Sequence, residues 1–216
     1  MMDRRRALMA SGDKQLCLKD IPIGAYFKEA ASSVLWIYCG VESGNCQLIR
    51  DQVLSSASKL RNDTLCDYEG GVIDTYLTGA YYNAQSEALR SAMADSEIAY
   101  SASDGSTVVT KTITRKIYIP TYAQSNYGKV IAGLRANRKG TNDNYNRAAM
   151  DSGGNYRAWW TMSAASTTKM HGFGTSGNDV SYVPNIGSGT VYRRPMISLK
   201  QDTLVELMDG IYVLAH

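Results

Sequence analysis

The chain has 216 residues, 44% of them hydrophobic and 20% charged, which is the composition of a globular protein with one sizeable core. Its net charge of +3 arises from basic and acidic residues interspersed along the chain, whereas nucleic-acid binding calls for a clustered basic face. No apolar run approaches the roughly 18 residues of a transmembrane helix, and the start of the chain lacks the apolar core of a signal peptide. Nucleic acid, membrane insertion and secretion by a signal peptide are therefore not expected.

The N-terminal residues 1–15 show no hydrophobic periodicity and include the basic tract Arg4-Arg5-Arg6. They predict a flexible arm that tethers a partner, or else a simple disordered terminus. The periodic part of the chain predicts one domain over residues 16–201. Residues 202–216 are expected to form a C-terminal strand or tail.

Strand signals dominate the start of this domain. Runs rich in β-branched and aromatic residues predict three strands, and the second and third are joined through a turn around Gly44, which indicates a β-hairpin. The three runs are residues 25–28, 33–39 and 46–51.

The four cysteines all lie in the first third of the chain, at positions 17, 39, 46 and 66. None forms a close pair of the kind that binds zinc, and the two histidines are remote, so no metal site is expected. Cys39 and Cys46 flank the predicted hairpin turn. They either face each other as a disulfide or are small buried thiols in a reduced compartment.

The middle of the chain alternates between helix and strand signals. Apolar spacing predicts short helices over residues 71–77 and 83–93, the second capped by Asn83. Strand composition returns at 97–101 and 108–120, which together predict a long hairpin arm leading into a core strand.

Residues 126–155 are rich in asparagine and glycine and carry several basic residues. The glycines interrupt any long element, so this tract predicts a loop with short helical turns at 127–134 and 145–150. Its basic side chains are expected to form a solvated surface.

A central strand is predicted over residues 156–162. Trp159 and Trp160 are adjacent, so in a strand they point to opposite faces and each needs apolar cover. Short strands at 169–174 and 179–184, joined by a turn at 176–179, follow this strand. A strand at 191–199 closes the sheet, with Pro195 allowed only at an edge, a bulge or a first position.

Catalytic motifs are missing from the sequence. His171 is the only internal histidine and no nucleophile elbow or phosphate-binding loop is present, so His171 is expected to be an exposed or half-exposed strand residue. Between residues 105 and 200 the only carboxylates are Asp143, Asp151 and Asp179, which disfavours a carboxylate or calcium site there. No catalytic residue and no cofactor are predicted, although a carbohydrate-active hydrolase stays an alternative because paired carboxylates can come from anywhere in a fold.

The segment 163–190 is a polar, glycine-punctuated insert between two aromatic blocks, and its mixture of Tyr, Ser, Asn and Gly is typical of binding loops. We expect the aromatic blocks to form a rigid frame and the insert to display ligand contacts. Arg193 either clamps an anionic group or is a solvated charge at a strand end. The expected ligand-binding residues are Tyr156, Arg157, Ser166, Thr168, Met170, His171, Phe173, Asn178, Tyr182, Asn185, Tyr192 and Arg193. The expected frame residues are Trp36, Trp159, Trp160, Arg194 and Pro195.

Seven short blocks follow one another along the chain. They are Leu18-Lys19-Asp20-Ile21-Pro22-Ile23-Gly24, Trp36-Ile37-Tyr38-Cys39-Gly40, Leu48-Ile49-Arg50-Asp51, Ile73-Asp74-Thr75-Tyr76-Leu77, Lys116-Ile117-Tyr118-Ile119-Pro120, Trp159-Trp160-Thr161-Met162-Ser163 and Arg194-Pro195-Met196-Ile197-Ser198-Leu199. In this order, over roughly residues 18–200, the blocks resemble the DUF6273-type domain. The resemblance implies an α+β, C-type-lectin-like fold with mixed or antiparallel sheets, two short helices and long loops. It also implies a relation to the variable proteins of diversity-generating retroelements.

The same resemblance implies a biological setting. Such domains occur in phage and prophage tail proteins, which suggests a receptor-binding tail-tip or tail-fibre protein that recognises a bacterial cell-surface glycan or protein through loops 163–190. The location would be the virion, or the bacterial cytoplasm before assembly, with a homotrimer favoured. A structural assembly subunit, docked to neighbouring tail proteins through its N-terminal arm, is the alternative. The related formylglycine-generating enzymes use a C-terminal cysteine pair, and no cysteine follows Cys66 here, so their activity is not implied.

Overall fold

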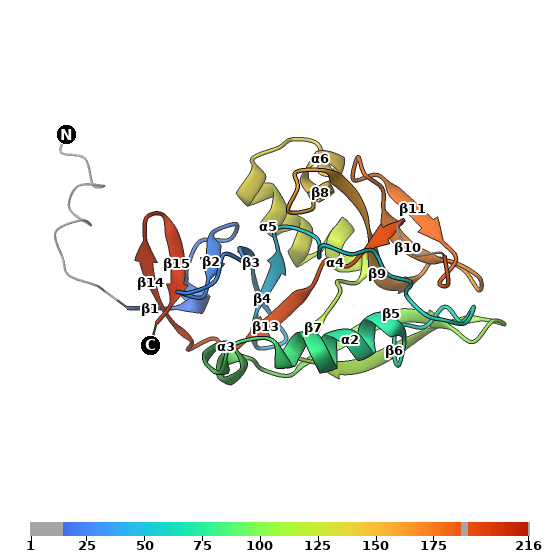
Figure 1. The fold of residues 1–216 in the computed structure, drawn as a ribbon, viewed down its shortest axis with the longest axis horizontal. Helices are drawn as coiled ribbons and strands as arrows, with labels where there is room; N and C mark the ends of the chain where they lie inside the picture. The colour runs from blue at the N-terminus through green and yellow to red at the C-terminus, as the bar shows by residue number, and fades with distance from the viewer. Residues whose placement is uncertain (1–14, 187–189, 216) are drawn as a thin grey trace.

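The computed structural model describes residues 15–186 and 190–215, so nearly all of the predicted N-terminal arm lies outside the described residues (Figure 1). The described part combines helices with three β-sheets, which confirms the α+β class. An eight-stranded sheet has the strand order β1-β14-β15-β2-β3-β4-β13-β7. A five-stranded sheet follows the order β11-β10-β9-β12 with β8 beside β9, and β5 pairs with β6 alone.

The eight-stranded sheet collects strands from both ends of the chain. Its members are β1 (Leu16–Cys17), β2 (Tyr26–Lys28), β3 (Trp36–Glu42), β4 (Asn45–Arg50), β7 (Ile117–Tyr118), β13 (Met196–Leu199), β14 (Leu204–Met208) and β15 (Ile211–Leu214). The last two, in the segment expected to be a C-terminal strand or tail, form a hairpin between β1 and β2. The C-terminal segment is thus an integral part of this sheet.

The predicted hairpin around Gly44 is confirmed. Glu42 pairs with Asn45, and the turn residues Ser43 and Gly44 both have positive φ, 51° and 78°. Cys46 pairs with Val41 and its Sγ lies 3.8 Å from the hydroxyl of Tyr38.

All four cysteines are free thiols, so no disulfide links Cys39 to Cys46. Cys39 lies against helix α5 (Lys129–Arg138), where a Cβ on Gly133 would come within 2.8 Å of its Sγ. Burial raises the pKa of Cys39 to about 12 and that of Cys46 to about 11, which keeps both thiols protonated and unreactive. Cys39 and Cys46 are therefore small buried thiols, as the second of the two alternatives predicted.

Both predicted helices in the middle of the chain are present, with shifted ends. The first consists of α2 (Val72–Tyr76) continued by the π-helical turn η3 (Leu77–Tyr81), and the second is α3 (Glu87–Ala92). Ser86 caps α3, since its Oγ accepts from the backbone N–H of Leu89 at 3.0 Å. The predicted cap at Asn83 was wrong because the turn before α3 places Ser86 at the N-cap.

Residues 122–147 hold three further helices, and the last two overlap the short helical turns expected at 127–134 and 145–150. These are α4 (Tyr122–Asn126), α5 (Lys129–Arg138) and α6 (Asp143–Arg147). α5 buries Val130 and Leu134 and lies across β3, and Gly133 permits that close approach. The expectation of two short helices was wrong, because tertiary packing on β3 stabilises a segment whose composition disfavours helix.

The five-stranded sheet contains the predicted central strand, β9 (Tyr156–Ala164). It is flanked by β10 (Met170–Phe173) and β12 (Val191–Tyr192), with β11 (Asp179–Tyr182) and β8 (Ala149–Met150) outside them. Trp159 and Trp160 are both fully buried and belong to different apolar clusters, which confirms a strand packed on both faces.

The predicted strand 191–199 is divided between two sheets. Val191 and Tyr192 pair in parallel with β9, whereas Met196–Leu199 pair with β4 in the eight-stranded sheet. Pro195 lies at the crossing, immediately before β13, where its missing N–H costs no ladder bond. The expectation of one closing strand was therefore wrong.

The hairpin arm is formed by β5 (Ser96–Ser103) and β6 (Val108–Arg115), which pair along their full length and lead into β7. In Figure 1 this arm runs along the bottom of the molecule, from the end near α3 toward β10 and β11. The exposed side of β5 lies next to α4, and the candidate site lies between these two elements.

Candidate ligand-binding groove

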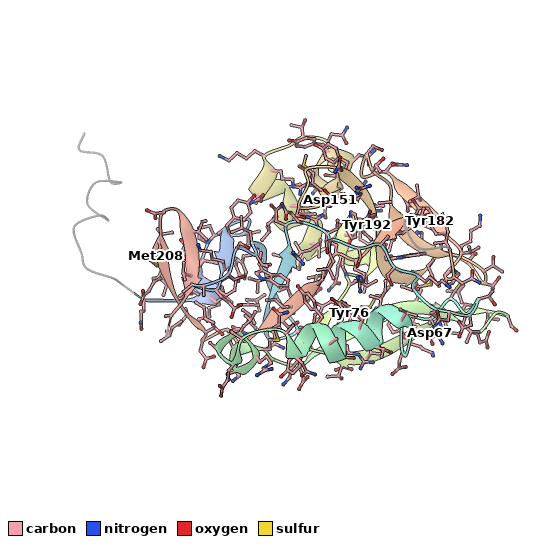
Figure 2. All side chains as sticks on the ribbon, viewed as in Figure 1. Asp67, Tyr76, Asp151, Tyr182, Tyr192 and Met208 are labelled. Atoms are coloured by element: carbon pink, nitrogen blue, oxygen red, sulfur yellow. The ribbon has the colours of Figure 1, made fainter. Side chains whose placement is uncertain are left out.

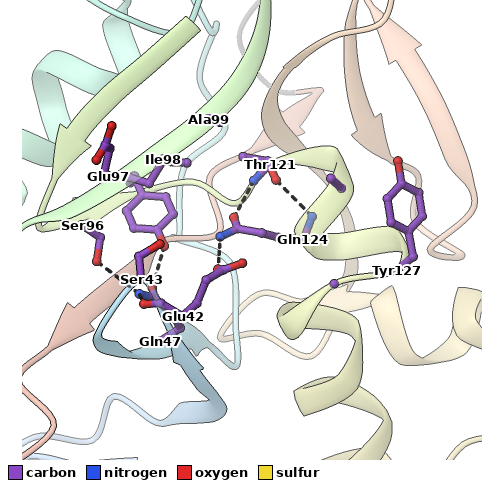
Figure 3. Close-up of a pocket in the computed structure, with 13 residues that line it drawn as sticks. Glu42, Ser43, Gln47, Ser96, Glu97, Ile98, Ala99, Thr121, Gln124 and Tyr127 are labelled. Atoms are coloured by element: carbon purple, nitrogen blue, oxygen red, sulfur yellow. Dashed lines mark hydrogen bonds between the residues drawn. The ribbon is translucent and has the colours of Figure 1, made fainter. Parts of the chain in front are cut away.

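Helix α4 carries an N-terminal capping box that fixes its orientation (Figure 3). The Thr121 hydroxyl accepts from the backbone N–H of Gln124, and the Gln124 carbonyl Oε1 accepts from the N–H of Thr121, both at 3.0 Å. The same Gln124 donates through Nε2 to the Glu42 carboxylate at 2.6 Å. One side chain therefore caps the helix and also ties it to the β3–β4 turn.

A buried polar network lies beneath this turn. The Gln47 Oε1 accepts from the hydroxyls of Tyr118, at 2.6 Å, and Ser198, at 3.0 Å. Its Nε2 donates to Ser96 Oγ at 3.2 Å, and Asn45 donates to the same Oγ at 3.0 Å. Because each group already has partners, the network holds β4, β5, β7 and β13 in a fixed relation.

Two neighbouring pockets open between α4 and β5. One, of about 330 Å³, extends from the β3–β4 turn past Glu97 to Tyr127. The other, of about 220 Å³, continues to Ser163 and His171. The two pockets share Ala99, Thr121, Ala123 and Tyr127, so we treat them as one channel and call it the α4 groove.

At the β10 end of the α4 groove, three side chains form an aromatic and polar cluster. The rings of Tyr122 and His171 stack with their centroids 3.9 Å apart. The Tyr122 hydroxyl donates to Asp179 Oδ2 at 2.7 Å, and His171 Nδ1 lies 3.3 Å from Asp179 Oδ1. Burial and the bond to Asp179 raise the pKa of Tyr122 to about 12, so this phenol is a neutral hydrogen-bond donor and not a base.

Arg147 supports this cluster from below. Its guanidinium is buried, lies 4.9 Å from the Phe173 ring centre, and donates to Gly177 O at 3.0 Å and to Asn126 Oδ1 at 2.9 Å. Burial lowers the pKa of this guanidinium. The expected solvated role was wrong for Arg147, which instead holds the β10–β11 turn against α6.

Of the predicted ligand-binding residues, His171 is the one that lines the α4 groove. Met170 and Phe173 are fully buried and support the sheet from inside. The more exposed members are spread over separate turns instead of forming one surface. Tyr156, Thr168 and Asn178 are exposed, and Arg157, Ser166, Tyr182 and Asn185 are partly buried.

A second small arrangement involves predicted residues at the β8–β9 end. Arg157 Nε donates to Asp151 Oδ2 at 2.7 Å, and its guanidinium lies 5.1 Å from the ring centre of Tyr192. These contacts satisfy Arg157 within the protein. Tyr156 beside it is 45% exposed and pairs with Met150.

Arg193 and Arg194 are both buried, so the expectation that Arg193 is a solvated charge was wrong. Arg193 donates to Ser56 Oγ at 2.6 Å and lies 4.1 Å from the ring centre of Tyr76. Arg194 is 0% exposed and donates to the carbonyls of Arg50, Asp51 and Arg147 at 3.0, 3.1 and 3.3 Å. Burial lowers its pKa to about 9.

The predicted frame residues Trp36, Trp159, Trp160, Arg194 and Pro195 are all buried. The indole N–H of Trp160 donates to Ser58 O at 2.8 Å, and that of Trp159 donates to Arg147 O at 3.0 Å. Arg194 joins the two sheets from the crossing between β12 and β13. These residues thus connect the sheets and do not face a ligand.

Sequence reasoning missed most of the groove. Glu42, Ser96, Glu97, Tyr122 and Tyr127 carry no catalytic or binding motif. The one local signal was Thr121-x-x-Gln124, which has the spacing of a capping box and marks the start of a helix. That signal predicts α4 but not the surface that α4 faces.

Within residues 15–186 and 190–215, no three His, Cys, Asp or Glu side chains come together as a potential metal site. In the same part of the chain, no helix combines the length and the apolar character that a membrane crossing needs.

Comparison with known proteins gave a family match. The model of the family described as "Domain of unknown function (DUF6273)" matches residues 43–201, which is most of the chain and includes every wall of the α4 groove except Glu42. No curated protein and no solved structure matches the chain. The chain belongs to the DUF6273 family.

Proposed function

We propose that this chain is a non-enzymatic recognition protein that binds a bacterial surface ligand in the α4 groove. One observation carries the proposal: the β3–β4 turn, β5, α4 and β10, which are far apart in sequence, converge on one open channel held by hydrogen-bond networks. Pre-formed channels lined by a few fixed polar groups are typical of ligand sites. Tyr127, 73% exposed, offers a rigid aromatic surface in this channel.

The geometry at the β10 end favours recognition over catalysis. Tyr122 is held as a neutral donor to Asp179, and His171 is stacked on its ring. A base in this place would need a free acceptor directed at a reacting proton. Here the Asp179 carboxylate already accepts from Tyr122 and lies beside His171 Nδ1, so Asp179 is not a free acceptor, and the three side chains form a fixed polar surface.

The finer parts of the proposal come from the order of the family blocks. A C-type-lectin-like fold and a place in a phage or prophage tail are what that resemblance implies, and the recognition role is consistent with both. On this proposal the ligand is a bacterial cell-surface glycan or protein. The loops 163–190 then contribute chiefly through His171, while the α4 groove makes the main contact.

A binding experiment with three tyrosine variants tests the location of the site. Labelled protein is incubated with intact bacterial cells and with isolated cell-wall material, and Tyr127→Ala is compared with Tyr145→Ala and Tyr156→Ala. Tyr145 is 55% exposed on α6, outside the groove, and is the matched control. We expect binding to be lost by Tyr127→Ala alone; loss by Tyr156→Ala alone would move the site to the β8–β9 edge.

A structural assembly subunit is the second candidate, and one observation favours it. Three large apolar side chains, Leu204, Leu207 and Met208, are exposed on strand β14, and Leu204 and Met208 share one face of that strand. Figure 2 shows Met208 at the end of the molecule opposite Tyr182. If Leu207→Lys abolishes incorporation into particles while Tyr127→Ala leaves binding intact, the assembly role is the correct one.

A carbohydrate-active hydrolase is the third candidate, favoured by the two carboxylates of the groove, Glu42 and Glu97. Turnover of a cell-wall glycan that disappears in Glu42→Gln or Glu97→Gln would replace the recognition proposal. Binding without turnover, in the same assay, supports recognition.

A further inference from the structure

The α4 groove has a charge character that differs from the rest of the chain. The protein carries 23 Lys and Arg against 20 Asp and Glu. The groove, however, is lined by Glu42 and Glu97 and by no lysine or arginine among the described residues. Neither glutamate makes an ion pair in the described part of the chain. An anionic ligand would be repelled here, and a cationic group would find two carboxylates without a cationic partner.

Ser96 adds a second, independent feature. It is 2% exposed, it lines the same pocket, and its Oγ accepts from both Asn45 and Gln47. Both lone pairs of the hydroxyl are therefore occupied, and its hydrogen has no acceptor among the described residues. Because a buried hydroxyl favours a complete set of partners, this hydrogen is available to an oxygen of a ligand in the groove.

The groove is lined by side chains from one face of β5. Glu97, Ala99 and Ser101 alternate along that face, and β5 is paired with β6 along one of its two edges. Hydroxyls, amides and an aromatic ring presented in this way suit a polyhydroxylated ligand. Tyr127 offers a ring face for a sugar or for a cationic substituent on it.

We propose that the α4 groove binds a sugar that carries a free ammonium group, with Glu42 and Glu97 facing the ammonium, Ser96 donating to a sugar oxygen and Tyr127 supporting the ring. This inference rests on the proposed function, because it assumes that the groove is the ligand site. It adds the ligand class, an unacetylated amino sugar, and excludes anionic glycans.

Calorimetric titration of the full chain with three oligosaccharides of similar length tests the ligand class. The probes are a glucosamine oligomer, its N-acetylated counterpart and a uronic-acid oligomer. We expect the glucosamine oligomer to bind at least about tenfold more tightly than the acetylated one, because acetylation removes the charge, and the uronic-acid oligomer not to bind. The preference should decrease as ionic strength rises. Equal binding of the acetylated or acidic oligomer overturns the inference, as does the absence of binding by all three.

Variants connect the preference to the groove. Glu97→Gln and Glu42→Gln keep the shape and remove charge, and we expect each to reduce the preference for glucosamine. Thermal unfolding should be unchanged in Glu97→Gln, whereas Glu42→Gln also weakens the bond from Gln124 Nε2. Glu87→Gln, on α3 outside the groove, is the control. If oligolysine binds as tightly as the glucosamine oligomer, the site selects an ammonium without the sugar and the inference is wrong. If no oligosaccharide binds but cells are still bound in a Tyr127-dependent way, this inference fails while the proposed function stands.

Discussion

Gly133 in α5 supports a quantitative prediction about how this fold is held together. A Cβ at this position would lie 2.8 Å from Cys39 Sγ, 2.9 Å from Cys39 Cα and 3.1 Å from Tyr38 O. Two of these atoms are backbone, so the neighbour cannot simply rotate away. Replacing glycine by alanine in a helix normally stabilises by up to about 1 kcal/mol, whereas overpacking of this kind costs about 1–3 kcal/mol. We therefore expect Gly133→Ala to lower the free energy of unfolding by about 1–2 kcal/mol.

Gly79 is the matched control for this prediction. It lies in the helical turn η3, and a Cβ added at this position would have no other atom within 4 Å. Gly79→Ala should therefore raise the free energy of unfolding by up to about 1 kcal/mol. Urea unfolding of both variants, followed by tryptophan fluorescence, measures the two effects. If Gly133→Ala is as stable as Gly79→Ala, the close approach of α5 to β3 is not what requires the glycine.

Three further predictions concern stability. Arg194→Met should lower the free energy of unfolding by about 3 kcal/mol, because the carbonyls of Arg50 and Asp51 lose a donor while Arg147 O keeps its bond from Trp159. Urea unfolding measures this loss, and an unchanged midpoint would contradict it. Gly177→Ala should cost more than about 2 kcal/mol, since Gly177 has φ +75° and its Cβ would lie 1.8 Å from Asn144 O, and the loss should appear as a lower melting temperature. Burial alone would raise the pKa of Asp67, but the bonds from Lys111 and Tyr100 lower that pKa overall. The Asp67 carboxylate therefore stabilises the fold near neutral pH, and this contribution is lost as the pH falls through the lowered pKa. Asp67→Asn should remove that part of the acid dependence of the melting temperature.

The sequence predicted those parts of the fold that depend on local pattern. Strand β9 was placed correctly because two adjacent tryptophans require apolar cover on both faces, and the β3–β4 hairpin was placed correctly because Gly44 marks its turn. The errors occurred where distant contacts decide. Only a short helical turn at 127–134 was expected where α5 forms, because the glycine and polar residues of this tract disfavour helix, and its packing on β3 was not visible from residues 126–155 alone.

The burial of the arginines could not be predicted from the sequence either. Arg147 and Arg193 were expected at solvated positions, yet both are buried, as is Arg194, and their guanidiniums contact carbonyl oxygens, amides, hydroxyls or aromatic rings. Arg193 Nε has no hydrogen-bond partner among the described residues. No carboxylate partner marks them in the sequence. A guanidinium has five donors in a fixed plane, so scattered acceptors from several segments can hold it, and such acceptors leave no sequence pattern.

The α4 groove could not be predicted for a related reason. Its walls come from the β3–β4 turn, β5 and α4, and the polar groups that fix them meet only after the eight-stranded sheet and the β5–β6 hairpin have formed around Gln47. The segment 163–190 attracted attention because its composition is that of a binding loop, but its apolar members Met170 and Phe173 are needed inside the sheet. From this segment, Ser163 and His171 line the groove where β9 and β10 meet α4. The placement of His171 in the groove therefore depends on the strand register of β9 and β10, in which Phe173 pairs with Trp159 and their ring centres lie 4.8 Å apart.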